Sequence, residues 1–169
     1  MINDVLYLDE EPGACAVAHA DVHVRCMIQR VGYVLSCILQ RAGMEDASLY
    51  MDSGERHLWV DWGRASRGNY LWLLSLLVHL IAESDYRFTP TVRGKVKWER
   101  ARHVAAACLD MCSAIPAGSM TSVPMSFGVH EVTGLLDRHR SEYAHRVLDS
   151  GVDAEWTRRE RPEWLEEVS

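Results

Sequence analysis

The sequence predicts an all-α protein: a single compact domain of about five helices, residues 1–169, with a short extended N-terminal lead. With 169 residues, of which 48% are hydrophobic, the chain is long enough for one core. Residues 70–82 form an almost unbroken apolar run, as a buried helix does. Apolar residues also recur at the spacing of one helix face, at Val24, Ile28, Val31, Leu35 and Ile38.

The first elements follow from charge and turn residues. Residues 4–8 are mostly apolar and predict a short strand or extended arm. The acidic stretch 9–11 and Pro12 then favour a helix start, because carboxylates stabilise the positive N-terminal end and proline is tolerated in the first turn. We expect one long helix from about residue 13 to residue 41, ended by Gly43.

The middle of the chain predicts two further helices. After a polar connection, residues 55–62 predict a short helix that carries His57. Ser66 is a typical N-cap residue, and the apolar run behind it predicts a helix over 67–88, enclosed on most sides. The apolar run over 70–82 is shorter than the roughly 20 residues that span a bilayer, so we expect no membrane partner.

The last third predicts two helices separated by a loop. The helices cover 94–114 and 130–149, and the loop between them, 115–128, is long enough to act as the lid of a site. Residues 154–169 are basic and aromatic, and we expect them to dock on the helices as a tail. The expected docking residues are Trp156 and Trp164.

His19 and His23 are the first candidates for chemistry. Residues four apart on a helix share a face, with Cβ atoms about 5–6 Å apart, so both rings would reach one pocket and orient a substrate. With His57, Asp21 or Glu83 as a third ligand they would chelate a divalent metal. No zinc-type spacing accompanies them, so we favour a pocket with no metal and no other cofactor. Histidines with purely structural hydrogen bonds are the alternative.

The start of the helix predicted over 67–88 is a candidate phosphate site. A helix N-terminus offers unpaired N–H groups, and guanidinium groups match phosphate oxygens. The residues concerned are Arg64, Arg67, Asn69 and the neighbouring His57. Trp59 and Trp62 would stack on a base, and we expect this end of the helix to lie over the two histidines. Solvated arginines and core tryptophans are the alternative.

Glu83 and Arg87 lie at the other end of the same predicted helix. Burial among apolar side chains would raise the pKa of Glu83 and suit it to acid–base catalysis. Arg87 is a candidate for binding the substrate. A salt bridge in which Glu83 orients Arg87 or a histidine is the alternative.

The overall charge argues against a dedicated duplex-DNA binder, because such proteins are commonly basic, whereas this chain has a net charge of −6. Basic residues nevertheless gather in the helix predicted over 94–114 and in the tail, as a nucleic-acid face or a merely solvated one. They are Arg93, Lys95, Lys97, Arg100, Arg102, Arg158, Arg159 and Arg161. The odd number of cysteines, 5, and the lack of a signal-peptide pattern indicate a cytoplasmic protein with free thiols.

Short distinctive segments are spread along almost the whole chain. They are LYLDEEP (6–12), CA (15–16), HADVHV (19–24) with Met27, His57, Trp62, Arg64, Ser66 with NYLWL (69–73), YR (86–87), VPMSF (123–127) and WTRRERPEWL (156–165). In kind and order they resemble an uncharacterised family of small helical bacteriophage proteins. The resemblance implies a phage protein that works in the cytoplasm of the host cell.

More distantly, the layout resembles the phage pyrimidine-dimer DNA glycosylases of the endonuclease V type. Those are small helical proteins with an early histidine-bearing helix and an aromatic, basic tail. The correspondence places His23 at their early histidine and Arg30 where they carry the catalytic glutamate. Their nucleophile is an N-terminal amine exposed when methionine is removed, whereas the bulk of Ile2 would leave Met1 in place. The chain therefore departs from that group at two of its three chemical parts.

The expected function is that of a phage protein acting on DNA or nucleotides, as a pyrimidine-directed, glycosylase-like or base-modifying enzyme. The expected catalytic residues are His19, His23 and Glu83, and the expected substrate and phosphate ligands are His57, Trp62, Arg64, Arg67, Asn69 and Arg87. One alternative is a non-enzymatic phage factor that binds a host protein or a signalling nucleotide to counter host defence. The other is a metal enzyme ligated by His19, His23 and His57.

Overall fold

The computed structural model describes residues 4–88, 92–124, 134–149 and 154–166. Within these ranges the chain forms helices and no strand, which confirms the all-α prediction. The helices are α1 (Pro12–Ala18), α2 (Asp21–Arg41), α3 (Leu58–Ala65), α4 (Arg67–Arg87), α5 (Val92–Asp110), the 3-10 turn η1 (Cys112–Ala114), α6 (Leu135–Asp149) and the 3-10 turn η2 (Glu163–Leu165).

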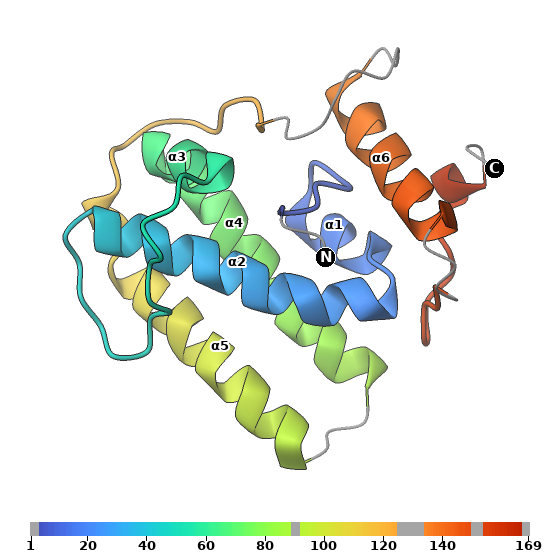
Figure 1. The fold of residues 1–169 in the computed structure, drawn as a ribbon, viewed down its shortest axis with the longest axis horizontal. Coiled ribbons are helices and arrows are strands. Elements are labelled where there is room, and N and C mark those ends of the chain that lie inside the picture. Colours follow the sequence, from blue (N-terminus) through green and yellow to red (C-terminus); the bar gives the residue numbers. More distant parts are fainter. Residues whose placement is uncertain (1–3, 89–91, 125–133, 150–153, 167–169) are drawn as a thin grey trace.

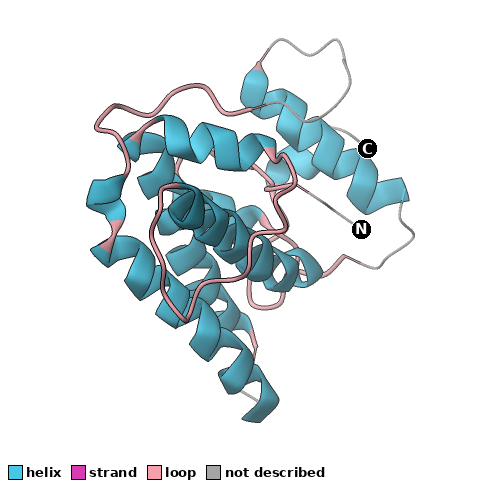
Figure 2. Ribbon diagram, turned by 60° about the vertical axis from the view of Figure 1, so that its left-hand side comes forward, coloured by secondary structure: helices cyan, strands magenta, loops and turns pink. Residues whose placement is uncertain are grey.

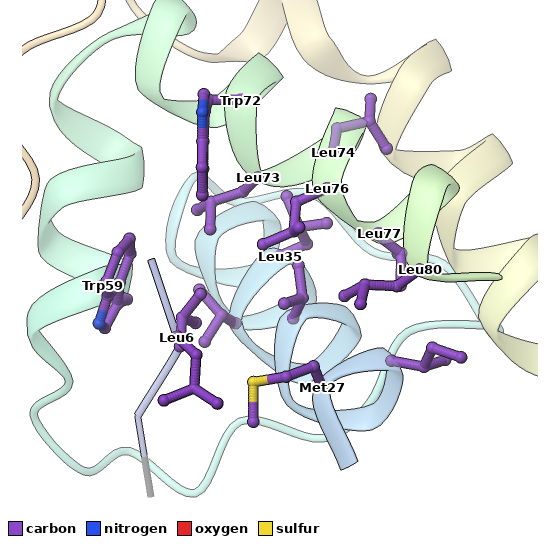
Figure 3. Packing of buried hydrophobic residues seen from close by; sticks show 14 of the residues in the cluster. Leu6, Met27, Leu35, Trp59, Trp72, Leu73, Leu74, Leu76, Leu77 and Leu80 are labelled. Carbon is purple, nitrogen blue, oxygen red and sulfur yellow. The ribbon is translucent and has the colours of Figure 1, made fainter. Parts of the chain in front are cut away.

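Helix α4 is the centre of the packing, because it contacts α1, α2, α3 and α5. Figure 1 shows α2 crossing in front of α4, with α5 on the side away from α6. Leucines of α4 pack against Met27 and Leu35 of α2 (Figure 3). The fully buried leucines of α4 are Leu73, Leu76, Leu77 and Leu80. Together with Met27 and Leu35, these four leucines form the centre of the hydrophobic core.

The N-terminal lead is extended but forms no strand. Residues 5–8 are all buried beneath the helices. Cys15 of α1 holds the lead in place, because its Sγ accepts a hydrogen bond from the Leu8 N–H (3.3 Å) and donates one to the Leu6 carbonyl (3.5 Å). The lead pairs with a thiol rather than with another strand.

The single long helix expected from residue 13 to residue 41 is wrong, because the chain breaks at His19 and Ala20 between α1 and α2. Both residues have extended backbone angles. The carbonyls freed by the break are bonded by remote side chains: Arg87 donates to the carbonyls of Val17 (2.7 Å) and His19 (2.7 Å), and Trp156 donates to that of Ala18 (3.1 Å). Tertiary hydrogen bonds therefore replace those of a continuous helix.

The other predicted boundaries differ less. Ser66 caps α4, which spans Arg67–Arg87 against the expected 67–88. The short helix begins later than expected, at Leu58, since the His57 ring accepts from the Trp59 N–H and forms its N-cap. The expected 94–114 helix is α5 followed by η1. In the region of the last predicted helix, 130–133 lie outside the described residues, and α6 begins at Leu135.

Helix α4 is less enclosed than its composition suggests. Leu71 and Val78, both within the apolar run, are 40% and 50% exposed, so the helix is not enclosed at these two positions. Among the described helices, α2 is the one whose length and apolar composition would let it cross a bilayer. That stretch is 61% buried against the rest of the chain, and the core helix of a soluble protein meets the same criterion.

Candidate functional site

The predicted site residues lie in two separate places, one at each end of α4. At its C-terminal end are His19, His23, Glu83 and Arg87, and at its N-terminal end are His57, Trp62, Arg64, Arg67 and Asn69. From residue 69 to residue 83 the helix rises by about 21 Å, at about 1.5 Å per residue. The arginine-bearing start of α4 therefore does not lie over the two histidines, contrary to our expectation.

His19 is completely buried at the corner between α1 and α2. Its Nδ1 lies 2.6 Å from the Cys15 carbonyl, which can only accept, so Nδ1 carries the proton. Burial lowers the pKa of His19 to about 3, which keeps the ring neutral. Its Nε2 is then a buried lone pair, and it has no hydrogen-bond partner in the described chain.

His23 is half-buried and is oriented by Tyr143 of α6. The Tyr143 hydroxyl lies 2.8 Å from His23 Nδ1 and accepts a hydrogen bond from the Ala20 N–H, also at 2.8 Å. The Tyr143 hydroxyl therefore joins the backbone at the start of α2 to the His23 ring and fixes the orientation of that ring. The rings of His23 and His19 both meet Tyr143 edge-on, with centroids 5.1 and 6.2 Å from it.

Glu83 and Arg87 form a buried ion network, as the salt-bridge alternative predicts. The Arg87 guanidinium is fully buried and donates to Glu83 (2.6 Å) and Asp21 (3.0 Å). Arg159 of the tail makes two further bonds to Glu83, each 2.8 Å. Burial raises the pKa of Glu83, but the hydrogen bonds from Arg159 and Arg87 outweigh it and leave the pKa below its ordinary value. The raised pKa expected for acid–base catalysis is therefore wrong.

The N–H groups at the start of α4 are occupied by the loop that follows η1. The amides of Arg67 and Gly68 donate to the carbonyls of Pro116 (2.7 Å) and Gly118 (2.9 Å). A Cβ at Gly68 would lie 2.3 Å from the Met120 nitrogen, so only glycine allows this close approach. The anion site expected here is filled by backbone carbonyls.

The polar side chains around it are also engaged within the chain. The Arg67 guanidinium donates to two loop carbonyls, of Ser113 (3.3 Å) and Ile115 (3.1 Å). Asn69 is buried and bonds the Trp62 carbonyl (2.8 Å) and Thr121 (2.7 and 3.0 Å). The remaining predicted arginine, Arg64, is exposed and donates to the Arg41 carbonyl at 3.3 Å. These contacts fix the loop to α3 and α4.

A cluster of aromatic rings lies between the N-terminal lead, α3, α4 and α6. Trp59 is its centre, with ring centroids 5.3 Å from Trp62, 6.4 Å from Trp72 and 6.5 Å from His139. Tyr7 lies 5.2 Å from Trp72 and 5.4 Å from His139. All five side chains are buried. In Figure 3 the nitrogen-bearing end of Trp59 points away from the leucines of the core.

Three nitrogen atoms of this cluster are buried and have no hydrogen-bond partner in the described chain: Trp59 Nε1, Trp62 Nε1 and His139 Nε2. The two indoles are donors. Burial lowers the pKa of His139 despite the nearby Asp4 carboxylate and a hydrogen bond to the Pro124 backbone. Because that backbone group is a carbonyl, the neutral ring keeps its proton on Nδ1 and Nε2 is an acceptor. The cluster thus holds two unsatisfied donors and one unsatisfied acceptor.

Helix α6 joins the histidine corner to this cluster. His139 and Tyr143 are four residues apart on α6, so they project from one face of the helix. The ring belt, as we call the two groups that α6 connects, consists of Tyr143 with His19 and His23, and of His139 with Tyr7, Trp59, Trp62 and Trp72. Sequence reasoning missed His139 and Tyr143, although their spacing in the predicted last helix was a usable signal.

The metal site considered for His19, His23 and His57 is not formed. No cluster of three or more His, Cys, Asp or Glu side chains with metal-binding geometry occurs in the described parts of the chain. His57 caps α3 instead. Asp21 and Glu83, the other candidate third ligands, are bound to Arg87.

Most described members of the two basic clusters serve the fold. Arg100 donates to the Ser48 and Leu49 carbonyls, and Arg102 pairs with Asp85. In the tail, Arg158 donates to the Tyr86 carbonyl and Arg159 to Glu83, while Arg161 lies over the Trp156 ring. The side chains of Arg93, Lys95 and Lys97 lie outside the described residues. A nucleic-acid face made of these residues stays a prediction.

Comparisons of the chain with models of protein families, with curated proteins and with solved structures find no match. The resemblance to phage proteins therefore stays a prediction. The structure itself defines the class, an all-α protein whose candidate site is a buried belt of imidazole, indole and phenol rings.

Proposed function

We propose that this protein binds a nucleobase, carried by a nucleotide or by DNA, in the ring belt. The observation that carries the proposal is the set of unsatisfied nitrogens in the aromatic cluster, Trp59 Nε1, Trp62 Nε1 and His139 Nε2. A buried polar group left without a partner costs about 1–3 kcal/mol. Three such groups side by side support a polar, planar ligand that completes them.

A nucleobase satisfies both requirements of the cluster. Its edge carries hydrogen-bond acceptors for the two indole N–H groups and a donor for His139 Nε2. Its faces stack on aromatic rings, an interaction worth about 1–3 kcal/mol per base. A phosphate alone would meet the two donors but would be repelled by the imidazole lone pair. The base, rather than the phosphate, is therefore the part that we expect the belt to recognise.

His23 is the residue that we expect to act on the ligand. The Tyr143 hydroxyl lies 2.8 Å from its Nδ1 and orients the ring. An imidazole N–H held in place can stabilise negative charge that develops on an oxygen of a base. This supports a base-modifying or glycosylase-like reaction by a phage enzyme, the activity expected from the sequence.

A second candidate is binding without turnover, as in a phage factor that sequesters a signalling nucleotide or a host protein. The state of Glu83 favours it. This carboxylate is held by Arg87 and Arg159 and its pKa lies below the ordinary value, so it does not supply the proton that an acid catalyst needs. A binding protein needs no such group.

The test is a titration of the purified protein at low salt with each of the four deoxynucleoside monophosphates and with a short single-stranded oligonucleotide. Tryptophan fluorescence is the readout of binding. We expect saturable quenching, because Trp59, Trp62 and Trp72 line the belt. In parallel, His23→Ala and His79→Ala are compared for binding and for base release or modification. His79 is an exposed histidine whose Nδ1 bonds the Ser75 carbonyl of its own helix, so it is the matched control.

Loss of turnover with retained binding in His23→Ala, and no change in His79→Ala, supports the enzyme. Binding that never leads to product, in the unmodified protein and in both variants, supports the second candidate. No quenching by any nucleotide or by the oligonucleotide contradicts both forms of nucleobase binding.

A further inference from the structure

We propose that α6 and residues 154–166 act as a lid that opens away from the other helices and gives access to the ring belt. The opening is a property of the fold and can be measured without a ligand. The role of the lid in admitting a nucleobase rests on the proposed function.

The lid lies to one side of the molecule. Figures 1 and 2 show α6 and the C-terminal segment beside each other, near α1 and away from α5. Within the lid, α6 packs against η2. The central helices α2 and α4 pack against each other without it, through the leucine core. The lid contributes Tyr143, Ala144 and Val147 to the buried core, so opening it exposes these side chains but leaves the contacts between α2 and α4 in place.

Polar contacts hold the lid against the other helices. Arg159 makes two bonds to Glu83 (2.8 Å each), and Thr157 donates through its N–H and its hydroxyl to Asp21. Arg140 donates to Asp9 and to the Leu8 carbonyl, both at 2.9 Å. Such bonds exchange readily for bonds to water when the lid opens, so the main cost of opening is the exposure of the buried Tyr143, Ala144 and Val147.

Buried nitrogens without a hydrogen-bond partner lie at the boundary between the lid and the other helices, which we call the seam. His139 of the lid meets Trp59, and Tyr143 of the lid meets His19. His139 Nε2, Trp59 Nε1 and His19 Nε2 are all buried there without a hydrogen-bond partner in the described chain. Opening the lid would let water reach these nitrogens, and a ligand with the right edge would satisfy them when the lid closes. The unsatisfied nitrogens therefore favour local opening at the seam.

Hydrogen exchange of the full chain, read by mass spectrometry, tests the lid directly. We expect the amides of α6 to exchange faster than those of α2 and α4, under conditions where the protein stays folded. Arg159→Ala should speed exchange in α6 about tenfold, because it removes a charged, two-bond contact to Glu83.

Arg41→Ala is the matched control. Arg41 also makes two bonds to one carboxylate, Asp52 (2.6 and 3.0 Å), but it lies at the end of α2, away from the lid. It should leave exchange in α6 unchanged. If α6 exchanges at the same free energy as α2 and α4, or if both variants affect it equally, the lid does not open separately and the proposal is overturned.

A further arm separates this proposal from the proposed function. Exchange is repeated with saturating dTMP and with dAMP. Slower exchange in α6 supports both a lid and nucleobase binding. A lid that opens as expected but is unaffected by either nucleotide supports the lid and contradicts closure on a nucleobase.

Discussion

Replacing Arg87 with methionine tests the buried network at the corner between α1 and α2. Methionine keeps most of the side-chain volume but removes a guanidinium that is fully buried. The carboxylates of Glu83 and Asp21 lose one partner each, and the carbonyls of Val17 and His19 lose their Arg87 donor. We expect the free energy of unfolding to fall by about 4 kcal/mol.

The magnitude follows from the partners that stay behind. Removing one member of a buried ion pair costs about 3–5 kcal/mol, because the other charge remains buried. Glu83 keeps its two bonds to Arg159 and Asp21 keeps Thr157, which lowers the cost. The two carbonyls raise it again, since each loses a donor in the protein interior. A loss of this size is a large part of the roughly 5–15 kcal/mol that stabilises a typical domain.

Urea unfolding followed by circular dichroism measures the loss, with Arg102→Met as control. The pair between Arg102 and Asp85 has both side chains 47% exposed, so its removal should cost less than about 1 kcal/mol. The reasoning is refuted if Arg87→Met and Arg102→Met lose stability equally. That result would mean that Arg87 adds no more to the fold than a surface arginine does.

Three further changes test other parts of the argument. Tyr143→Phe should cost about 1–3 kcal/mol, because the Ala20 N–H loses its acceptor. Nitrogen NMR should show a shift of the His23 Nδ1 signal, since that nitrogen loses its hydroxyl partner; an unchanged signal would contradict the role given to the hydroxyl. Because the pKa of His19 is about 3 in the folded protein and about 6.5 in an unfolded chain, protonation favours the unfolded state. His19 therefore lowers the free energy of unfolding by up to about 1.4 kcal/mol per pH unit as the pH falls from about 6.5 towards 3, and an NMR midpoint above pH 5 would refute its burial. Gly68→Ala normally stabilises a helix but should here lower the melting temperature, because the new Cβ meets the Met120 backbone at 2.3 Å; a rise would show that the loop does not lie on α4.

Local signals explain what the sequence predicted well. The cap at Ser66 and the apolar run behind it lie within one segment, so the bounds of α4 were readable from neighbours in the chain. Docking of the tail through Trp156 and Trp164 is confirmed, by the bond from Trp156 to the Ala18 carbonyl and by the contact of Trp164 with Tyr143 at 6.0 Å. Large aromatic residues in a polar segment needed a surface to cover.

The break between α1 and α2 was not readable in this way. Its main hydrogen-bond donor, Arg87, is 68 residues from the His19 carbonyl that it binds. The helix periodicity continues through residues 19 and 20, and local preferences alone favour one helix. The candidate site was missed in part for the same reason, because the partner of His23 is Tyr143, 120 residues further along. Long-range hydrogen bonds overrode the local pattern in both cases.

The capping of α1 by Trp156 has a consequence for synthesis of the chain on the ribosome. The indole that satisfies the Ala18 carbonyl lies 138 residues further along the chain, so the bend stays incomplete until Trp156 has left the ribosome. A nascent chain halted before residue 154 should hold its early residues in a different arrangement, with the first two helices fused or frayed.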